Sequence, residues 1–237
     1  MDKIKLIAFD LDGTLTQHKE PLTEENRHVL DELARRYHLV MMGAGQAARI
    51  SRQMGGYPID IVGNYGLQYA TCDEAGELHL LRDEHLPCDR EEVARRALRL
   101  RRELGYTDYT GESVEYHPSG CLTLPVLGTK AAAGDKLAFD PDRKKRRAVY
   151  DKVAAAFPEY HVFVGGSSSF DMAPRPYNKY YALNEYCKAL GLTHEQVVYV
   201  GDDYGPGGND ESIYLSDFRF ITVDDYRDFP ARMEQLL

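Results

Sequence analysis

The stretch FDLDGTL, from Phe9 to Leu15, decides the fold. It begins at the end of the apolar run KIKLIAF of residues 3–9, which is typical of a buried parallel strand. Asp10 and Asp12 therefore lie at the carboxyl end of this strand, where parallel α/β sheets bind their ligands. Two carboxylates so close repel each other unless a cation lies between them, and such oxygen ligands suit Mg²⁺. An acidic turn that only caps the next helix is the alternative, but it does not explain why an apolar strand runs directly into two aspartates.

A second acidic loop follows another apolar strand. The run VVYV of residues 197–200 leads into GDDYGPGGNDE, whose polar side chains are Asp202, Asp203, Asn209, Asp210 and Glu211. Lys179 begins the helix before this strand, where its ammonium group can compensate the carboxylates and hold phosphate oxygens. A solvated glycine-rich turn and a solvated surface lysine are the alternatives, and neither explains why two acidic loops would share one sheet edge.

Strands and helices alternate at both ends of the chain, which predicts an α/β fold with a parallel sheet and right-handed crossovers. Further strands are predicted at residues 38–42 and 59–63. Between residues 84 and 175 the order becomes helix, two strands, helix, two strands, which is typical of a small α+β unit. We therefore expect a parallel-sheet core domain, formed by residues 1–84 and 177–237, with a two-helix, four-strand α+β domain of residues 85–176 inserted into it.

Composition and charge exclude several classes of protein. The chain has 237 residues, of which 43% are apolar and 28% charged, and a formal charge of −9. This balance argues against bulk nucleic-acid binding, and no apolar run reaches the ~18–20 residues that span a membrane. The N-terminus does not resemble a secretory signal, and the cysteines are scattered without the spacing of a disulfide framework or a zinc site, so we expect a cytoplasmic protein. The cysteines are Cys72, Cys88, Cys121 and Cys187.

These motifs together resemble those of the haloacid dehalogenase superfamily of phosphoryl-transfer enzymes. The resemblance rests on FDLDGTL, the glycine turn after the second strand, Lys179 and GDDYGPGGND. Within the superfamily, GGSSSFDMAPRPYNKYYAL and the PGGND loop resemble the eukaryotic-type phosphomannomutase branch. The resemblance covers essentially the whole chain and implies a Rossmann-like core with an inserted α+β cap of type IIB.

The resemblance also implies a role for each acidic motif. Asp10 would be the nucleophile that becomes phosphorylated, and Asp12 would be the general acid–base. Mg²⁺ would be bound by Asp10, by the backbone carbonyl of Asp12 and by Asp202, while Lys179 steadies the nucleophile and the phosphate. This assignment agrees with elementary chemistry, because a carboxylate that attacks an anionic phosphoryl group needs its charge neutralised.

The chain departs from the family where phosphate is bound. Most of the superfamily offers Ser or Thr after the second strand, whereas Gly43, Ala44 and Gly45 offer backbone N–H groups alone. Thr129 and Lys136 stand where the branch has cap arginines, and lysine lacks the bidentate fork of arginine. The substrate-binding residues that we expect are Lys19, which replaces a core arginine, Gly43, Ala44, Gly45, Thr129, Lys136, Asn209, and the retained sugar-contacting residues Ser169 and Asp171.

These departures favour a hydrolase. A mutase must bind the distal phosphate of a sugar bisphosphate strongly while it keeps water from Asp10. Lysines in place of the arginines bind that phosphate less strongly. We therefore expect a Mg²⁺-dependent phosphohydrolase that acts on a sugar phosphate or a similar small phosphomonoester, with a phosphomannomutase-like phosphohexomutase as the alternative. We expect no nucleic-acid or membrane partner, and a homodimer formed through the cap.

Two other function classes fit isolated motifs. Residues 43–48 match the GxGxxA fingerprint of dinucleotide-binding oxidoreductases, but this turn follows the second strand and lacks the acidic residue expected about 20 positions later. The basic runs at residues 95–103 and 143–147 would suit a nucleic-acid-binding module. They lie on predicted helices of the inserted domain, however, where solvated helix faces explain them.

Overall fold

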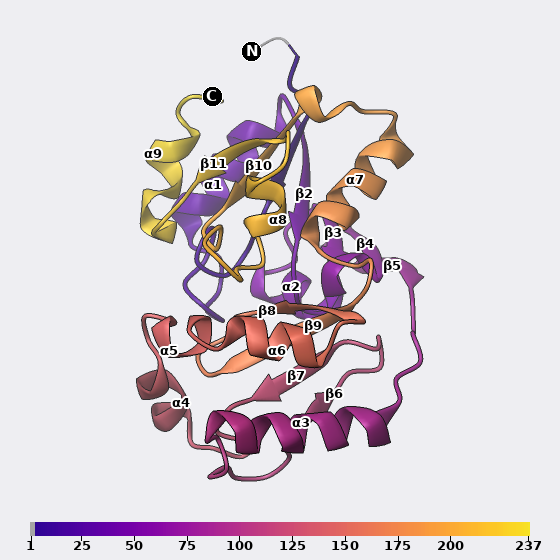
Figure 1. Cartoon of the computed structure of the whole chain (residues 1–237). Helices are drawn as coiled ribbons and strands as arrows, with labels where there is room; N and C mark the ends of the chain where they lie inside the picture. The colour runs from indigo at the N-terminus through magenta and orange to yellow at the C-terminus, as the bar shows by residue number, and fades with distance from the viewer. Residues whose placement is uncertain (1–2) are drawn as a thin grey trace. The chain divides into compact units, whose positions relative to one another are not determined.

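The computed structural model describes residues 3–237, which divide into two units (Figure 1). Unit 1 comprises the chain up to Glu84 together with Asn178–Gly205 and Asp210–Leu237. Unit 2 comprises His85–Tyr177 and also Pro206–Asn209, a short piece of the second acidic loop that the sequence analysis assigned to the core domain. None of the helices in this described range is long and apolar enough to cross a membrane.

Unit 1 contains a seven-stranded sheet in the order β11-β10-β1-β2-β3-β4-β5. Five of its strands run parallel: β1 (Leu6–Phe9), β2 (His38–Met42), β3 (Asp60–Gly63), β10 (Val197–Gly201) and β11 (Arg219–Thr222). The hairpin of β4 (Gln68–Cys72) and β5 (Leu78–Asp83) adds two antiparallel strands at one edge.

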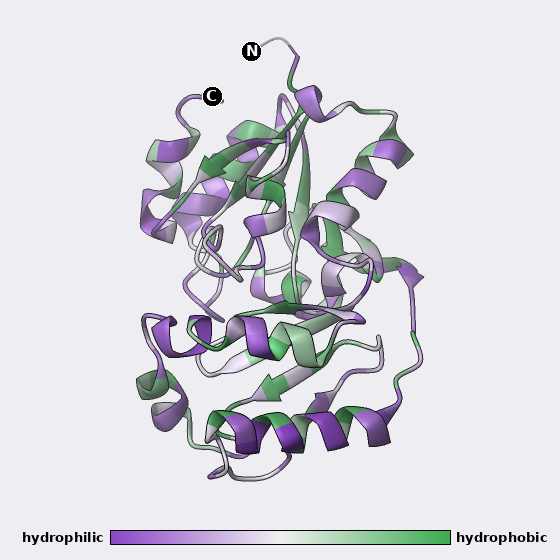
Figure 2. Cartoon of the chain, viewed as in Figure 1, coloured by the Kyte–Doolittle hydropathy of each residue, from purple (hydrophilic) through white to green (hydrophobic). Residues whose placement is uncertain are grey.

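The central strands of the unit 1 sheet are buried on both faces, and successive side chains of each strand point to opposite sides. Ile7 and Phe9 of β1 pack on one face, together with α1 and α9, whereas Leu6 and Ala8 pack on the other face with α7. The strands of unit 1 are accordingly mostly green in Figure 2. The helices and 3₁₀ turns of this unit are α1 (Glu24–Ala34), α2 (Ala47–Gln53), α7 (Lys179–Leu190), α8 (Glu211–Tyr214), α9 (Phe229–Met233), η1 (Asn64–Gly66), η2 (His194–Gln196) and η3 (Tyr226–Asp228).

Unit 2 contains an antiparallel four-stranded sheet in the order β6-β7-β9-β8. Its strands are β6 (Glu115–Tyr116), β7 (Leu122–Pro125), β8 (Tyr160–Phe163) and β9 (Ser169–Pro174), and its helices are α3 (Arg90–Leu104), α4 (Ala133–Phe139), α5 (Lys144–Arg147) and α6 (Tyr150–Ala156). A parallel-sheet unit and a separate antiparallel α+β unit confirm the predicted fold class.

The helices of unit 2 differ from the prediction in two ways. The second helix predicted in the inserted domain is divided into α5 and α6, because Val149 leaves the helical region with φ −114° and ψ 3°. Helix α4 is not predicted at all. It has no buried residue, so it shows none of the apolar periodicity by which a helix is found in a sequence.

Two arginines of the basic runs are buried, which corrects the prediction that these runs are solvated helix faces. Arg101 is 3% exposed and Arg146 is fully buried. The Arg101 guanidinium donates to the backbone oxygens of Tyr106, Pro125 and Val126. Arg146 likewise donates to the backbone oxygens of Gly165, Gly166 and Ser169, so each buried guanidinium group is satisfied by backbone carbonyls.

Candidate active site

The two acidic loops of unit 1 meet because their strands are neighbours. Strands β1 and β10 pair in parallel, with Phe9 opposite Val200, and the backbone N–H of Asp10 donates to the carbonyl of Val200 at 2.9 Å. Carboxylate oxygens of Asp10, Asp202 and Asp210 consequently lie within 4.8 Å of one another. The structure therefore brings together Asp10 and Asp202, the predicted metal ligands, and adds Asp210 to them.

Lys179 is the cation of this carboxylate cluster. Its Nζ donates to Asp10 Oδ1 at 2.5 Å and to Asp210 Oδ1 at 2.7 Å, and its side chain is 1% exposed. It is the first residue of α7, whose start is fixed by Asn178, since this side chain accepts a hydrogen bond from the backbone N–H of Tyr181. The predicted position of Lys179 between the two acidic loops is thus present in the structure.

Tyr199 also contacts the cluster, although its sequence position does not indicate this. Its hydroxyl group donates to Asp210 Oδ1 at 2.6 Å, and the Lys179 ammonium lies 5.9 Å from the centre of its ring. Tyr199 lies in the apolar strand β10, and this pattern predicts an ordinary core residue. Nothing in the sequence pattern shows that its hydroxyl group ends among carboxylates.

The charges of the cluster are poised to accept a further cation. Burial, reinforced by the neighbouring Asp10 and Asp210, raises the pKa of Asp202 to about 9. Burial also raises the pKa of Asp10 to about 6, although Lys179 opposes the shift. Burial alone would lower the pKa of Lys179, but the two carboxylates that it contacts outweigh burial and raise it. One lysine therefore does not neutralise this group of aspartates.

The space around Asp202 agrees with a bound metal ion. Gly13 has a φ of +100°, and a Cβ added there would come within 2.5 Å of Asp202 Oδ2. The Thr14 hydroxyl group donates to Asp202 Oδ1 at 3.1 Å and orients this carboxylate. A set of buried carboxylate oxygens with excess negative charge is the donor set that Mg²⁺ prefers, so the residues fit the predicted cofactor.

Asp12 lies apart from the metal-type cluster, and its carboxylate is held by three donors. Oδ1 accepts the Gln53 amide at 2.7 Å and the backbone N–H of Lys19 at 2.8 Å, and Arg49 lies 3.3 Å from Oδ2. Burial favours the neutral acid, but these hydrogen bonds outweigh it and lower the pKa of Asp12. Arg49 and Gln53 were not identified from the sequence. Their spacing of four residues places them on one face of a helix, but it does not say that this face meets Asp12.

The glycine turn after β2 is partly engaged within the protein. The N–H of Gly43 donates to the carbonyl of Val62 at 2.9 Å, so this predicted phosphate donor already has an acceptor. A Cβ added at Gly45 would lie 2.5 Å from Nε of Arg49, so a side chain there would displace the guanidinium group that contacts Asp12. Ala44 follows Gly43 in this turn and is half-buried.

The remaining predicted substrate residues are distributed over both units. Lys19 is exposed in unit 1, where its backbone N–H rather than its ammonium group contacts Asp12. Asn209 belongs to the part of the acidic loop that clusters with unit 2. In unit 2, Lys136 Nζ donates to the backbone oxygen of Thr129 at 3.1 Å, so these two predicted residues lie together.

Ser169 and Asp171 both lie on β9. The Ser169 hydroxyl group donates to the carbonyl of Gly165 at 3.1 Å, and Asp171 accepts a hydrogen bond from Thr123 at 3.1 Å. Burial raises the pKa of Asp171, and the Thr123 hydrogen bond only partly opposes this. A Cβ at Gly165 would overlap the Asp171 carboxylate, so a glycine is required beside it.

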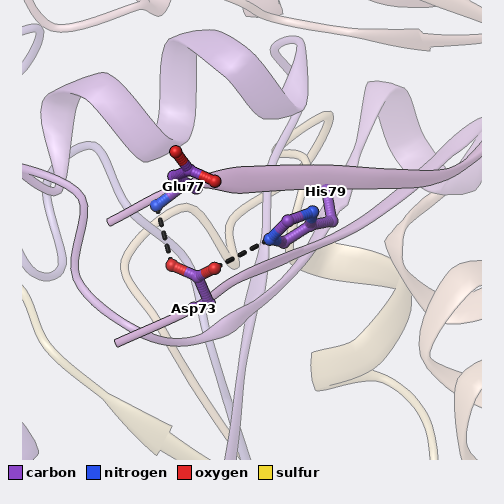
Figure 3. Close-up of side chains that lie close together, drawn as sticks. All are labelled: Asp73, Glu77 and His79. Carbon is purple, nitrogen blue, oxygen red and sulfur yellow. Dashed lines mark hydrogen bonds and ion pairs between the residues drawn. The ribbon is translucent and has the colours of Figure 1, made fainter. Parts of the chain in front are cut away.

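A second group of metal-type side chains lies at the turn between β4 and β5 (Figure 3). Asp73 accepts hydrogen bonds from the backbone N–H groups of Ala75 and Glu77 at 2.9 Å, and His79 Nε2 lies 2.8 Å from its other oxygen. These contacts close the hairpin turn, as an Asp at such a position commonly does. The group is exposed or half-buried, and its hydrogen bonds explain it as part of the turn.

Comparisons with known proteins agree with this geometry. The family model of eukaryotic phosphomannomutase matches residues 27–228. A probable phosphomannomutase of Caenorhabditis elegans is 25% identical, covering 98% of this chain and 95% of its own, and a phosphomannomutase of Saccharomyces cerevisiae is 24% identical, covering 90% and 85%. The structure of a haloacid dehalogenase-like hydrolase from B. subtilis matches with a TM-score of 0.67 at 17% identity, covering 99% of this chain and all (100%) of the other. This last likeness confirms the predicted fold.

Proposed function

Because the chain belongs to the eukaryotic phosphomannomutase family of the haloacid dehalogenase superfamily, we propose that it is a Mg²⁺-dependent phosphohexomutase. The structural observation that carries the proposal is the buried contact of Lys179 with both Asp10 and Asp210, beside Asp202. The replaced arginines in the sequence favour a hydrolase, with the mutase as the alternative. The family membership agrees better with that alternative.

In the proposed reaction Asp10 attacks a phosphorus atom of a hexose 1,6-bisphosphate. Lys179 holds Oδ1 of Asp10, which leaves Oδ2 to form the new bond to phosphorus. The bond from phosphorus to the sugar oxygen breaks at the same time, and that oxygen takes a proton from Asp12. The reverse step transfers the phosphoryl group from Asp10 to the free hydroxyl group of a hexose 1-phosphate, while Asp12 accepts the proton, and this regenerates the bisphosphate. The net result is hexose 6-phosphate formed from hexose 1-phosphate with no loss of phosphate.

Three groups would hold the metal ion: the carboxylates of Asp10 and Asp202 and the backbone carbonyl of Asp12. When bound there, Mg²⁺ would neutralise negative charge on the phosphoryl group during its transfer. Lys179 adds a positive charge from within the protein, in a buried site where a fixed charge acts more strongly than in water. Asp210, which Tyr199 and Lys179 both contact, keeps the lysine in place.

Ser169 and Asp171 on β9 are proposed to contact the sugar hydroxyl groups. Both side chains are polar and lie on one strand at spacing two, so they share a face of the sheet. A hydrolase remains the second candidate. It is favoured by Thr129 and Lys136, which stand where a mutase of this family is expected to have cap arginines. Lys136 Nζ donates to the Thr129 carbonyl. A lysine lacks the guanidinium fork that binds a distal phosphate through two hydrogen bonds.

One experiment separates the two candidates. Purified protein is given mannose 1-phosphate or glucose 1-phosphate with Mg²⁺ and a trace of the hexose 1,6-bisphosphate, and both hexose 6-phosphate and free phosphate are followed. We expect hexose 6-phosphate that depends on the bisphosphate, with little free phosphate. Free phosphate without hexose 6-phosphate would replace the mutase by the hydrolase. Asp10→Asn should be inactive while its circular dichroism is unchanged, and wild-type turnover by this variant would refute the role of Asp10.

A further inference from the structure

Helix α2 directs two long side chains at the carboxylate of Asp12. Gln53 Nε2 donates to Asp12 Oδ1 at 2.7 Å and to Thr16 Oγ1 at 2.9 Å. Arg49 Nη1 donates to Gln53 Oε1 at 2.7 Å and lies 3.3 Å from Asp12 Oδ2. Both ends of the Gln53 amide are therefore held, next to the loop that carries the paired aspartates.

Donor and acceptor chemistry allows only one orientation of this amide. A guanidinium group can only donate, so the atom that faces Arg49 must be the carbonyl oxygen of Gln53. An ionised carboxylate can only accept, so the group that faces Asp12 must be the amide NH₂. Gln53 thus links the position of α2, whose Ala47 and Ile50 are buried in the core of unit 1, to the rotamer of Asp12.

The two oxygens of the Asp12 carboxylate have different surroundings. Oδ1 accepts two short hydrogen bonds, from Gln53 at 2.7 Å and from the backbone N–H of Lys19 at 2.8 Å, and His18 Nδ1 lies 3.9 Å from it. Oδ2 has the longer contact, with Arg49 at 3.3 Å. Because Oδ1 is the more firmly held atom, Oδ2 is the oxygen that is better placed to exchange a proton.

We propose that Gln53 is a positioning residue, which fixes Asp12 so that Oδ2 reaches the oxygen of the departing sugar. This inference rests on the proposed function. As phosphorus bonds to Asp10 and separates from the sugar oxygen, the proton of Asp12 Oδ2 passes to that oxygen. In the return step the attacking hydroxyl group gives its proton back to Oδ2. Gln53 does not touch the reacting atoms and acts only through Asp12.

The dependence of the rate on the leaving group distinguishes this role from a structural one. A sugar leaves as an alkoxide and needs the proton of Asp12, whereas 4-nitrophenolate is a stable anion and does not. The ratio kcat/KM reports the steps up to departure of the leaving group, so it excludes later breakdown of the phosphorylated Asp10. A defect in positioning Asp12 should therefore appear in kcat/KM for hexose phosphates and be small for 4-nitrophenyl phosphate.

The test is Gln53→Ala, with kcat/KM measured for hexose 1,6-bisphosphate, phenyl phosphate and 4-nitrophenyl phosphate. We expect a loss of about ten- to hundredfold for the hexose phosphate, as for one hydrogen bond to a charged group, and a smaller loss for phenyl phosphate. The value for 4-nitrophenyl phosphate should stay within about threefold of wild type. Gln53→Glu keeps the shape of the side chain but cannot donate to Asp12 when ionised, so it should lose at least as much on the hexose phosphate.

Arg52→Ala is the matched control, because Arg52 is an exposed residue of the same helix. It should leave all three values unchanged. Equal losses of Gln53→Ala on all three substrates would mean that Gln53 only supports the fold, and would overturn the inference. Turnover by Asp10→Asn at the wild-type rate would instead overturn the proposed function, and the inference with it.

Discussion

Arg146 offers a demanding test of how unit 2 is held together. Its guanidinium group is fully buried and donates through Nε to Asp140 Oδ2 at 2.9 Å. Nη1 donates to the carbonyls of Gly165 at 2.5 Å and Ser169 at 2.9 Å. One side chain therefore ties α5 to the turn that leads into β9, the strand of the proposed sugar contacts. Arg146→Met retains most of the side-chain volume and removes these bonds.

The expected cost follows from the loss of a buried counter-charge. Removing one partner of a buried ion pair costs about 3–5 kcal/mol, because the other charge remains buried without compensation. In a chain of this size each kcal/mol shifts the unfolding midpoint by roughly 2–4 °C. The variant should therefore unfold about 6–20 °C below the wild type at neutral pH.

The sign of the pH dependence is a second, independent check. In the wild type, burial favours neutral Asp140, but the hydrogen bond from Arg146 and those from backbone N–H groups outweigh it and lower its pKa. Its contribution to stability is thus present above the unfolded pKa of about 3.9 and is lost as the pH falls through the lower folded pKa. Without Arg146 the pKa of buried Asp140 rises instead. The loss of unfolding free energy in Arg146→Met, relative to the wild type, should then be smaller at about pH 5 than at about pH 7.5.

The assay is thermal unfolding followed by circular dichroism, since the chain has no tryptophan whose fluorescence could report unfolding. Hydrogen exchange of residues 160–174 shows whether the turn before β9 opens first. Arg102→Met, at an exposed position of α3, is the control and should change stability by no more than about 0.5 kcal/mol. Adding Asp140→Asn to Arg146→Met should recover part of the loss, because the uncompensated charge is removed. A loss no larger than that of Arg102→Met, or a deficit that grows toward acid pH, would refute this reasoning.

Three further predictions concern the proposed reaction. Lys179→Met removes the ammonium group that contacts Asp10, so kcat with hexose 1-phosphate should fall at least about a hundredfold. Mg²⁺ should stabilise the folded protein by about 2.7 kcal/mol at a hundredfold excess over its Kd, and Asp202→Asn should reduce this gain in thermal unfolding. Ser169→Ala and Asp171→Ala should lower kcat/KM for a hexose phosphate more than for 4-nitrophenyl phosphate, because only the sugar carries the hydroxyl groups that they are proposed to bind.

Each of these three predictions has a distinct contrary result. Wild-type kcat in Lys179→Met would show that its contact with Asp10 is not used in phosphoryl transfer. An equal Mg²⁺-dependent shift in wild type and Asp202→Asn would place the metal ion elsewhere. Equal losses on both substrates after Ser169→Ala or Asp171→Ala would indicate that β9 supports the fold rather than the sugar.

Local patterns were enough to predict much of the molecule. The apolar run before Asp10 predicted β1, and the alternation of strands and helices predicted the parallel sheet, because strand and helix periods are properties of neighbouring residues. The acidic loop after residues 197–200 was predicted to lie at the same sheet edge as Asp10. The structure places Asp10 and Asp202 together there.

Only the tertiary structure decided which distant side chains are partners. Strand β10 is the neighbour of β1, and this brings Asp210 and the Tyr199 hydroxyl group to Lys179, although Tyr199 looks like a core residue in its strand. The packing of α2 likewise brings Gln53 to Asp12. Helical spacing places a residue on a face, but the face's partner depends on how whole elements pack.

The buried arginines show most clearly which properties follow from local sequence and which follow from long-range packing. The basic runs around Arg101 and Arg146 look like solvated helix faces, because charge is normally expensive to bury. Whether burial is tolerated depends on the acceptors that surround the guanidinium group, and in this fold they include backbone carbonyls outside the arginine's own helix, such as those of Pro125 and Gly165. The sequence by itself determined the elements and the charges at their ends, whereas the long-range packing of those elements decided which charges are buried and what they hold.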